Sequence, residues 1–569
     1  MTRWNLLLTT CAIGALAMAG CAPDAPDDLD DLATEEHGHE DAMRAAGAEV
    51  VLRDGLGTHG LRITTDSDSA QVYFDQGLRL SYAFNHPAAV ASFEKAASFD
   101  PECAMCYWGV AWASGPNINA ALSPEAGEVA HHAIHRALDL ADGVTDRERA
   151  YIEAMALRYE EDPITERARQ DSAYARAASA LADAYPGDPD AQVLAAEALM
   201  DLSPWDYWTE DGSPRPDTEA ILGRLLSVTE DDLEHAGACH FYIHAVEKFY
   251  PERAIPCAER LAGLMPGAGH IVHMPSHIYI RVGRYADAIE ANQGAVHAHG
   301  MNAEPAPDQG PDGFDQGYGS HNFHFLSFAA QMAGNRALAL ETARELEARI
   351  DPEMMRSPGL GALQHYLVTP LRVMVRFGMW DEILAEPAPP EDLAYPRGTW
   401  IYARGMAFAR TDRPAEAETE LEALRTLLGG EALEGVTVWE LNSAHTLLSI
   451  GERVLTGEVE AARGNTDAAV VALAEGVDME TDLTYDEPPP WHLPVRHVLG
   501  AVLLDADRTG EAEAVYLASL EQFPDNGYAL RGLELCLHAQ DDAAGASAAR
   551  EQFVVAWRAA DVELPGSRF

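Results

Sequence analysis

Residues 76–101 read QGLRLSYAFNHPAAVASFEKAASFDP, and this stretch predicts two helices joined by a short turn. The first helix is expected to end near Phe84. The second is expected to run from Pro87 to Phe99, with alanine and phenylalanine at its packing positions. Asp100 and Pro101 then end it, because a proline cannot continue a helix. The segment is therefore expected to form one helical hairpin.

Similar hairpins recur along the chain. Short turns rich in Gly, Asn, Asp and Ala join helical stretches at residues 283–288, 334–337, 412–417, 464–469 and 509–514. Self-similarity of this kind covers most of residues 68–560 and predicts a repeat array. The expected fold is an all-α solenoid of stacked helical hairpins, each of which buries its apolar face on its neighbours. The first helix of each pair is expected to line the concave face.

The composition agrees with an all-α fold and limits the kinds of partner that the protein can bind. Of 569 residues, 47% are hydrophobic, and strong helix formers such as Ala, Leu and Glu dominate. There are 92 acidic and 39 basic residues, a net charge of −53, and Lys95 and Lys248 are the only lysines. No basic patch is visible, so we expect no nucleic-acid partner. The acidic surface either keeps the protein soluble or attracts cations.

The N-terminus predicts export. Residues 1–20 combine a short basic start with an apolar stretch too short to span a bilayer, which indicates a signal peptide. The following Cys21 resembles the acylated cysteine of bacterial lipoproteins, and Ala22 in place of aspartate implies outer-membrane sorting. The expected location is the bacterial cell envelope, as an outer-membrane lipoprotein facing the periplasm or exterior, with the membrane contacted only through the lipid. Met18 fits the lipobox imperfectly, which leaves plain secretion open.

The predicted domains follow the repeats. Residues 21–66 are expected to form an acidic tether and extended lead-in. N-terminal repeats (67–300), a Gly/Pro loop (301–320), central repeats (321–480) and C-terminal repeats (481–569) follow. Three irregular stretches interrupt the pattern, at residues 203–216, 301–320 and 484–491. Long loops in a compact array are often functional.

Three motifs carry a family resemblance: AFNHPAAVASFEKAASFDPECAMCYWGVAWASGPNIN (83–119), HMPSHIY (273–279) and EPPPW (487–491). They resemble bacterial tetratricopeptide-repeat proteins of the secreted or lipoprotein type. The resemblance covers nearly the whole mature chain. It implies a tetratricopeptide (TPR) solenoid but no particular activity.

Histidines cluster in the middle of the chain. Ten of the 22 fall between residues 235 and 324. His240, His244 and Glu247 share one helical face, as do His270, His273 and His277. The same 33-residue spacing separates His240 from His273 and His244 from His277, which is about one tetratricopeptide period of roughly 34 residues. Side chains of successive repeats are therefore expected to converge.

Neutral imidazoles at this spacing, with a carboxylate nearby, suit Zn, Cu or Fe. Pro275, placed inside a helix, also favours a site. We therefore predict an envelope scaffold with a transition-metal site, whose core ligands are His240, His244, His273 and His277 and whose further ligands or supporting partners are Glu247, His270, His321 and His324. His365 can extend the row. Two alternatives stay open: a peptide- or protein-binding adaptor without metal, and a metal-dependent enzyme of unknown substrate.

Weaker candidates lie elsewhere. With Cys11 removed in the signal segment and Cys21 acylated, five cysteines remain, and an odd, sparse set argues against a disulfide framework. Cys103 and Cys106 form a CxxC that, with His86, fits a redox pair or soft-metal site, although small core residues are favoured. Asn117 and Asn119 belong to a predicted turn. Trp205, Tyr207, Trp208 and Trp491 are candidates for an aromatic wall over a ligand.

Overall fold

The computed structural model describes residues 50–569 except 161, 163, 231, 303–314 and 358. The predicted signal segment and Cys21 lie outside the described residues, as does most of the predicted Gly/Pro loop. No helix in the described part of the chain is long and apolar enough to cross a membrane.

Helices make up nearly all of the regular structure. The N-terminal helices are α2 (Asp68–Tyr82), α3 (His86–Phe99), α4 (Ala104–Ala113), α5 (Pro124–Leu140), η1 (Ala141–Gly143), α6 (Asp146–Ala156), α7 (Arg167–Ala184), α8 (Pro189–Met200), α9 (Thr218–Thr229), α10 (Ala236–Val246), η2 (Pro251–Ala254) and α11 (Ile255–Leu264). The central helices are α12 (Gly269–His273), α13 (Pro275–Arg281), α14 (Tyr285–Asn302), η3 (Asp315–Gly319), α15 (Ser320–Met332), α16 (Arg336–Arg349), η4 (Met354–Arg356), α17 (Gly361–Leu367), α18 (Thr369–Arg376) and α19 (Trp380–Ala385).

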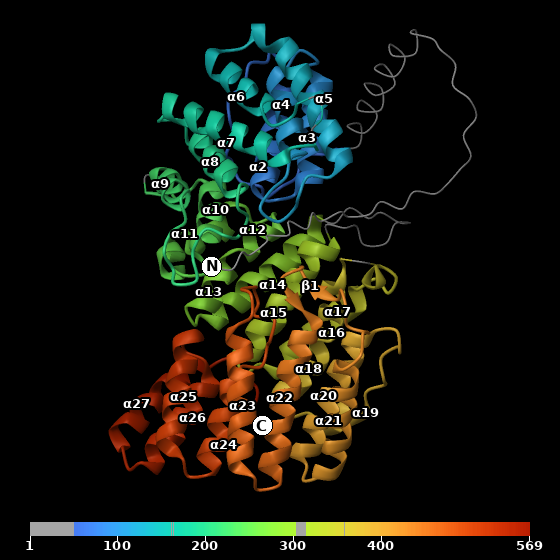
Figure 1. The fold of residues 1–569 in the computed structure, drawn as a ribbon. Coiled ribbons are helices and arrows are strands. Elements are labelled where there is room, and N and C mark those ends of the chain that lie inside the picture. The colour runs from blue at the N-terminus through green and yellow to red at the C-terminus, as the bar shows by residue number, and fades with distance from the viewer. Residues whose placement is uncertain (1–49, 161, 163, 231, 303–314, 358) are drawn as a thin grey trace, which may run out of the picture.

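The C-terminal elements complete the array. They are α20 (Ala394–Arg410), α21 (Pro414–Leu428), β1 (Thr437–Val438), β2 (Asn442–Ser443), α22 (Ala444–Ala462), α23 (Thr466–Thr481), α24 (Val495–Asp505), α25 (Thr509–Gln522), α26 (Gly527–Ala539) and α27 (Ala543–Ala556). β1 and β2 form a two-stranded antiparallel pair. Consecutive helices pair into antiparallel hairpins along the chain (Figure 1). The predicted all-α, TPR-like solenoid is confirmed.

The helices of each hairpin are joined at the turns predicted from the sequence. Helix α2 ends at Tyr82, and Asn85 caps α3 by accepting a hydrogen bond from the backbone N–H of Ala88. Asn335 caps α16 in the same way. The last predicted turn lies slightly earlier than expected, because Thr509 already begins α25. Polar caps of this type satisfy N–H groups that a helix start leaves without partners.

The solenoid turns back on itself, so that the C-terminal hairpins pack on the central ones (Figure 1). Gly283 and Gly334 have φ values of 78° and 75°. A Cβ on Gly283 would lie 2.6 Å from the carbonyl oxygen of Pro524, and one on Gly334 would lie 2.4 Å from the Trp557 ring. Both turns therefore need glycine for backbone conformation and for close packing.

The described part of the lead-in is also packed. Leu56, Leu61 and Ile63 belong to the main hydrophobic core, and the backbone N–H of Gly267 donates to the carbonyl of Gly55 at 2.8 Å. Residues 50–66 therefore lie along the surface of the N-terminal repeats and contribute to their core.

Candidate metal centre

The histidine-rich helices are the first helices of successive hairpins. Helix α10 carries His240 and His244, and the broken helix α12–α13 carries His270, His273 and His277. Helix α15 then carries His321 and His324. These helices lie in the middle of the molecule, between the N-terminal and C-terminal repeats (Figure 1). Six of these seven imidazoles are buried, with His240 and His273 0% exposed and His277 4% exposed, whereas His321 is partly buried. They form a buried row and do not line an open groove.

Helix α10 lies close to α2. A Cβ on Gly237 would lie 2.4 Å from the Tyr82 ring, so the helix can approach only where a glycine faces that ring. This approach lets Nδ1 of His240 donate to the backbone carbonyl of Tyr82 at 2.7 Å. A carbonyl oxygen can only accept, so the single proton of a neutral His240 lies on Nδ1 and Nε2 keeps its lone pair.

The break between α12 and α13 is at Pro275, as predicted. Met274 ends α12, and Pro275 occupies the first turn of α13. His270 and His273 therefore lie on one short helix, and His277 lies on the next. A proline has no N–H to donate, so the helical hydrogen-bond ladder is interrupted at this point.

Three histidines converge in the first trio, which is His240, His244 and His270. Nε2 of His240 lies 3.1 Å from Nε2 of His244 and 3.1 Å from Nε2 of His270. An unprotonated imidazole nitrogen has one lone pair and accepts one hydrogen bond along the direction of that lone pair. Two ring nitrogens therefore face one lone pair, and the buried Nδ1 atoms of His244 and His270 have no hydrogen-bond partner among the described residues. The first trio thus has the arrangement of three ligands around one cation.

The second trio is His273, His277 and His321. Each trio has three ligand nitrogens within 4.8 Å of one another. Nδ1 of His273 donates to Oδ1 of Asn292 at 2.7 Å, and the Asn292 amide is oriented by its own bond to the carbonyl of Ala288. Nε2 of His273 therefore keeps its lone pair, and it lies 2.9 Å from Nε2 of His277. Either an N–H of His277 that donates to His273 or a metal ion between the two rings accounts for this distance.

Two buried carboxylates lie behind the trios. Oε2 of Glu247 is 3.5 Å from Nδ1 of His244 and 3.4 Å from Nδ1 of His277, so it faces one histidine of each trio. Oε2 of Glu487 lies 2.8 Å from Nδ1 of His277. When such a carboxyl group is ionised, it orients a ligating imidazole and raises its basicity.

Burial sets the protonation of these groups. It lowers the pKa of His240 and of His277 to about 3, so the rings are neutral near pH 7. Burial also raises the pKa of Glu487 to about 8, against the opposing charge of Arg281. The pKa of Glu247 is well above its usual range, first through burial and then through the nearby charge of Glu487. Neutral imidazoles are the form that binds metal.

His324 lies apart from the first two trios. It belongs to a third trio with His365 and His492. Arg372 donates from Nη1 to Nε2 of His365 at 2.9 Å and from Nη2 to the Tyr395 hydroxyl at 2.5 Å. The guanidinium thus uses the His365 lone pair that a metal would need and adds a fixed positive charge. Arg372 therefore competes with a cation for His365, and the ligand role predicted for His324 remains a prediction.

Aromatic and amide groups cover the first trio. Phe84 stacks near the rings of His244 and His270. The Trp205 ring lies 5.0 Å from that of His244, and the Tyr318 ring lies 4.7 Å from that of His270.

Asn119 joins these two aromatic residues. Its Oδ1 accepts from the Trp205 indole at 3.2 Å, and its Nδ2 donates to the Tyr318 hydroxyl at 3.0 Å. Three segments that are irregular or turn-like in sequence therefore meet over one histidine group. Tyr207 and Trp208 are buried beside them, whereas Trp491 lies near the third trio.

The cysteines differ from the sequence-based expectation. Cys103 and Cys106 form a disulfide, and Cys239 and Cys257 form a second one between α10 and α11. The buried Cys536 is free. The preference for Cys103 and Cys106 as simple core residues was therefore wrong, whereas two separate bonds do not amount to the disulfide framework that the sequence argued against. Two isolated disulfides are compatible with a sparse, odd number of cysteines. The pairing of Cys239 with Cys257 depends on the packing of α10 against α11.

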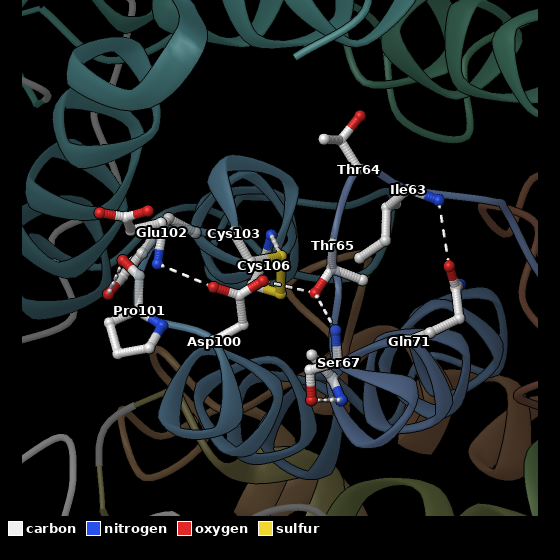
Figure 2. Close-up of a disulfide and its surroundings, with 12 residues drawn as sticks. Ile63, Thr64, Thr65, Ser67, Gln71, Asp100, Pro101, Glu102, Cys103 and Cys106 are labelled. Atoms are coloured by element: carbon white, nitrogen blue, oxygen red, sulfur yellow. Dashed lines mark hydrogen bonds between the residues drawn. A yellow bond between two sulfur atoms is a disulfide. The ribbon is translucent and has the colours of Figure 1, made fainter. Parts of the chain in front are cut away.

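Figure 2 shows how the lead-in passes the first disulfide. The Thr65 hydroxyl donates to the carboxylate of Asp100, which precedes the CxxC and also accepts from the backbone N–H of Glu102 at 3.1 Å. The backbone N–H of Ile63 donates to Gln71 at 3.1 Å. The disulfide is thus enclosed between α4 and the lead-in. His86 does not join it: its ring bonds the Ala113 carbonyl and the Asn117 amide.

No protein-family model and no curated protein matches this sequence. Among solved structures, the chain is similar to the human IFIT1 dimer with m7Gppp-AAAA, with 10% identity, a TM-score of 0.30, and coverage of 87% of this chain and 91% of that one. It is also similar to the P58(IPK) TPR domain (12% identity, TM-score 0.23, 83% and 98% covered) and to yeast Tom70 (9% identity, TM-score 0.26, 90% and 94% covered). At this level, likeness to these structures carries no argument about what the chain does.

Proposed function

We propose that this helical-repeat protein binds transition-metal ions at its first and second histidine trios. One observation carries the proposal: Nε2 of His240, whose lone pair is fixed by the Tyr82 carbonyl, is faced at 3.1 Å by two other ring nitrogens. Four tetrahedral nitrogens at about 2.0–2.1 Å from Zn²⁺ are about 3.3 Å from one another. The separations of 3.1 Å from His240 to its two neighbours and of 2.9 Å between His273 and His277 are slightly below this value, and the other pairs in each trio lie within 4.8 Å.

The chemistry of the proposed ligands limits which metal ions can bind. All six proposed ligands are imidazoles, and thiolates and thioethers are not among them. Imidazole suits Zn, Cu and Fe, whereas Mg and Ca prefer oxygen ligands. Three protein ligands leave a position open for water or a substrate. The proposed ligands are therefore His240, His244 and His270 for one ion and His273, His277 and His321 for the other, with Glu247 and Glu487 as supporting carboxylates.

Metal analysis of protein purified without a histidine tag tests the proposal. We expect one ion per trio in the wild type after loading with Zn²⁺, Cu²⁺ or Fe²⁺. His240→Ala should remove one ion and His273→Ala the other, because each change deletes a central ligand. His445→Ala is the matched control, since His445 is exposed on α22. If the wild type binds none of the three metals, or if His445→Ala loses as much metal as His240→Ala, the proposal fails.

Two broader predictions accompany this proposal. A helical-hairpin solenoid presents extended surfaces that suit a protein or peptide partner, but such a partner would have to bind away from the buried imidazoles. The open metal position beneath Trp205, Tyr318 and Asn119 also suits a metal-dependent enzyme. Turnover of a substrate that is lost with the metal would distinguish an enzyme from a metal carrier.

The predicted location remains an expectation. Disulfides persist mainly in oxidising compartments such as the bacterial periplasm. The bonds Cys103–Cys106 and Cys239–Cys257 therefore support an envelope or secreted protein. Mass spectrometry of Cys21 in membrane fractions would distinguish acylation from simple secretion.

A further inference from the structure

Three side chains over the first trio are joined by one amide. Asn119 is exposed, and both polar atoms of its side chain are used: Oδ1 accepts from the Trp205 indole at 3.2 Å, and Nδ2 donates to the Tyr318 hydroxyl at 3.0 Å. An indole N–H can only donate, so a single orientation of the amide serves both neighbours. We call Trp205, Asn119 and Tyr318 the cover of the first trio.

The cover lies between the first trio and solvent. Trp205 is 37% exposed, whereas His244 and His270 are 4% and 6% exposed. The Trp205 ring lies 5.0 Å from that of His244, and the Tyr318 ring lies 4.7 Å from that of His270. The third ring near these two imidazoles belongs to Phe84, which is buried. The cover therefore shields His244 and His270 on their exposed side.

The turn that carries Asn119 is a fixed support. The backbone N–H of Asn119 donates to the side-chain oxygen of Asn117 at 2.8 Å. Asn117 in turn exchanges two backbone hydrogen bonds with Ala120, and its amide donates to the ring of His86 at 3.1 Å. These bonds hold the Asn119 side chain in place from one side of the cover.

Trp205 is held less firmly. It lies on the irregular stretch between α8 and α9, and its backbone φ of 64° is in the left-handed region, where a bulky residue is strained. Its indole has one hydrogen-bond partner among the described residues, which is Asn119. The same stretch is anchored just beyond it, because the buried Trp208 donates to the carbonyl of Ala245 at 2.7 Å. An anchored loop thus presents one strained, partly exposed ring that a single hydrogen bond fastens.

The second trio has different surroundings. His321, one of its three histidines, is itself partly exposed. The ring of Phe325 packs against His273, His277 and His321. Access to the second trio at His321 therefore does not require the cover to open, and this trio serves as an internal comparison.

We propose that the cover is a gate, and that separation of Trp205 from Asn119 is the step that admits water and ions to His244 and His270. An ion that leaves the first trio passes the same gate, so the cover slows uptake and release together and leaves the equilibrium affinity nearly unchanged. The role in metal exchange rests on the proposed function, whereas the shielding of the two histidines does not. Lids that control access in this way are commonly short loop segments.

Chemical modification of the metal-free, full-length protein tests the shielding. Diethyl pyrocarbonate modifies accessible imidazoles, and peptide mass spectrometry gives a rate for each histidine. Trp205→Phe keeps an aromatic ring but lacks the indole N–H, so the gate opens more often. We expect His244 and His270 to be modified roughly 3- to 10-fold faster, the value of one hydrogen bond. The rate for His273 in the second trio should stay at its wild-type value.

Asn119→Ala removes both hydrogen bonds of the cover and should accelerate modification at least as much as Trp205→Phe. Asn465→Ala is the matched control, because it removes an exposed amide that donates to Glu460 at 2.7 Å in another part of the chain. It should leave every rate at His244 and His270 unchanged. Equal rates at His244 in the wild type and Asn119→Ala, or equal increases at His244 and His273, would overturn the gate.

Release of loaded Zn²⁺ into excess chelator tests the role in exchange. The His273→Ala background keeps only the first-trio ion, and there Asn119→Ala should speed release roughly 3- to 10-fold with little change in affinity. The His240→Ala background keeps only the second-trio ion, and there Asn119→Ala should change nothing. Faster modification with unchanged release would overturn the role in exchange. A wild type that binds no zinc, copper or iron refutes the proposed function, and the modification rates then decide the gate alone.

Discussion

The orientation of each imidazole is set by a residue that is not itself a ligand. Asn292 fixes the proton of His273 on Nδ1, and the Tyr82 carbonyl does the same for His240. Both rings therefore present a lone pair on the nitrogen that faces the other histidines. If a metal ion binds as proposed, these two groups orient the rings in advance, and groups in this position commonly tune metal affinity.

Asn292→Leu is expected to weaken metal binding to the second trio by about 10- to 100-fold, because the acceptor that holds His273 Nδ1–H is lost. Competition titration against a coloured chelator measures the affinity. Asn292→Asp keeps an acceptor in place and should bind metal far better than the leucine variant. Equal affinities for Asn292→Leu and the wild type would contradict a role for Asn292 in orienting the ring.

Helical spacing identified the central histidines and Glu247 but could not identify the supporting residues that are distant in sequence. His240, His244, His273 and His277 were predictable because 3.6-residue periodicity and the repeat length are local properties of the sequence. Glu487 was not predictable, since it reaches His277 from 210 positions further along the chain. His492 likewise lies near His365 through long-range packing, whereas Arg372 follows His365 by only seven positions. Nothing in their local sequence distinguishes them from ordinary helix and loop residues.

At the level of elements, the position of α10 depends on its contact with α2. Gly237 provides the space that the Tyr82 ring occupies, and Tyr82 is only 1% exposed. This ring cannot move away easily, because Trp112, Phe241 and His235 pack around it. The close helix contact is therefore a requirement for the hydrogen bond that fixes His240.

Gly237→Ala is expected to destabilise the protein by about 1–3 kcal/mol, the usual cost of overpacking a core. It should also weaken metal binding by the first trio, since α10 is displaced. Chemical denaturation followed by circular dichroism measures the first effect. Gly223→Ala on α9 is the control: nothing lies within 4 Å of its Cβ position, so alanine should stabilise this helix by roughly 0.5–1 kcal/mol. A Gly237→Ala variant as stable as the wild type would contradict the packing argument.

The junction between α23 and α24 predicts a pH effect. Glu480 is buried and accepts from the backbone N–H of Val495 at 3.0 Å, and burial raises its pKa to about 7. Between the usual glutamate pKa of about 4.3 and pH 7, the unfolded chain is ionised at this residue while the folded chain is protonated. Raising the pH through this window therefore favours unfolding.

Glu480→Gln should remove this contribution while keeping an acceptor for Val495. We expect the variant to lose less stability than the wild type between pH 4.5 and pH 7, as measured by urea denaturation at several pH values. Identical pH profiles would show that the folded-state pKa of Glu480 is not raised.

On the scale of the whole molecule, the repeat architecture was predictable and its closure was not. Turn residues and helix-forming composition are repeated in every hairpin, so the all-α solenoid follows from local patterns. The docking of the C-terminal hairpins on the turns at Gly283 and Gly334 involves residues far apart in sequence. The Cys239–Cys257 bond also escaped prediction, because sequence alone does not determine which cysteines meet.

The Cys239–Cys257 bond is expected to stabilise the region around His240. Replacing both cysteines with serine should lower the free energy of local opening of α10 and α11 by about 3 kcal/mol, the value for a loop of this length. Hydrogen exchange followed by mass spectrometry measures the opening. The Cys103→Ser/Cys106→Ser variant removes a bond that closes a much shorter loop, so it should show a smaller effect at its own site. Unchanged exchange in α10 and α11 would contradict this prediction.

The contact between Glu487 and His277 has a consequence for biosynthesis. A ribosome must release nearly the entire polypeptide before the carboxylate reaches the ring that it supports. Nascent or proteolysed chains that stop before the EPPPW motif would retain the imidazoles without their distant counterpart. Full metal occupancy of the proposed site would then require a completely synthesised chain, because only such a chain places Glu487 beside His277.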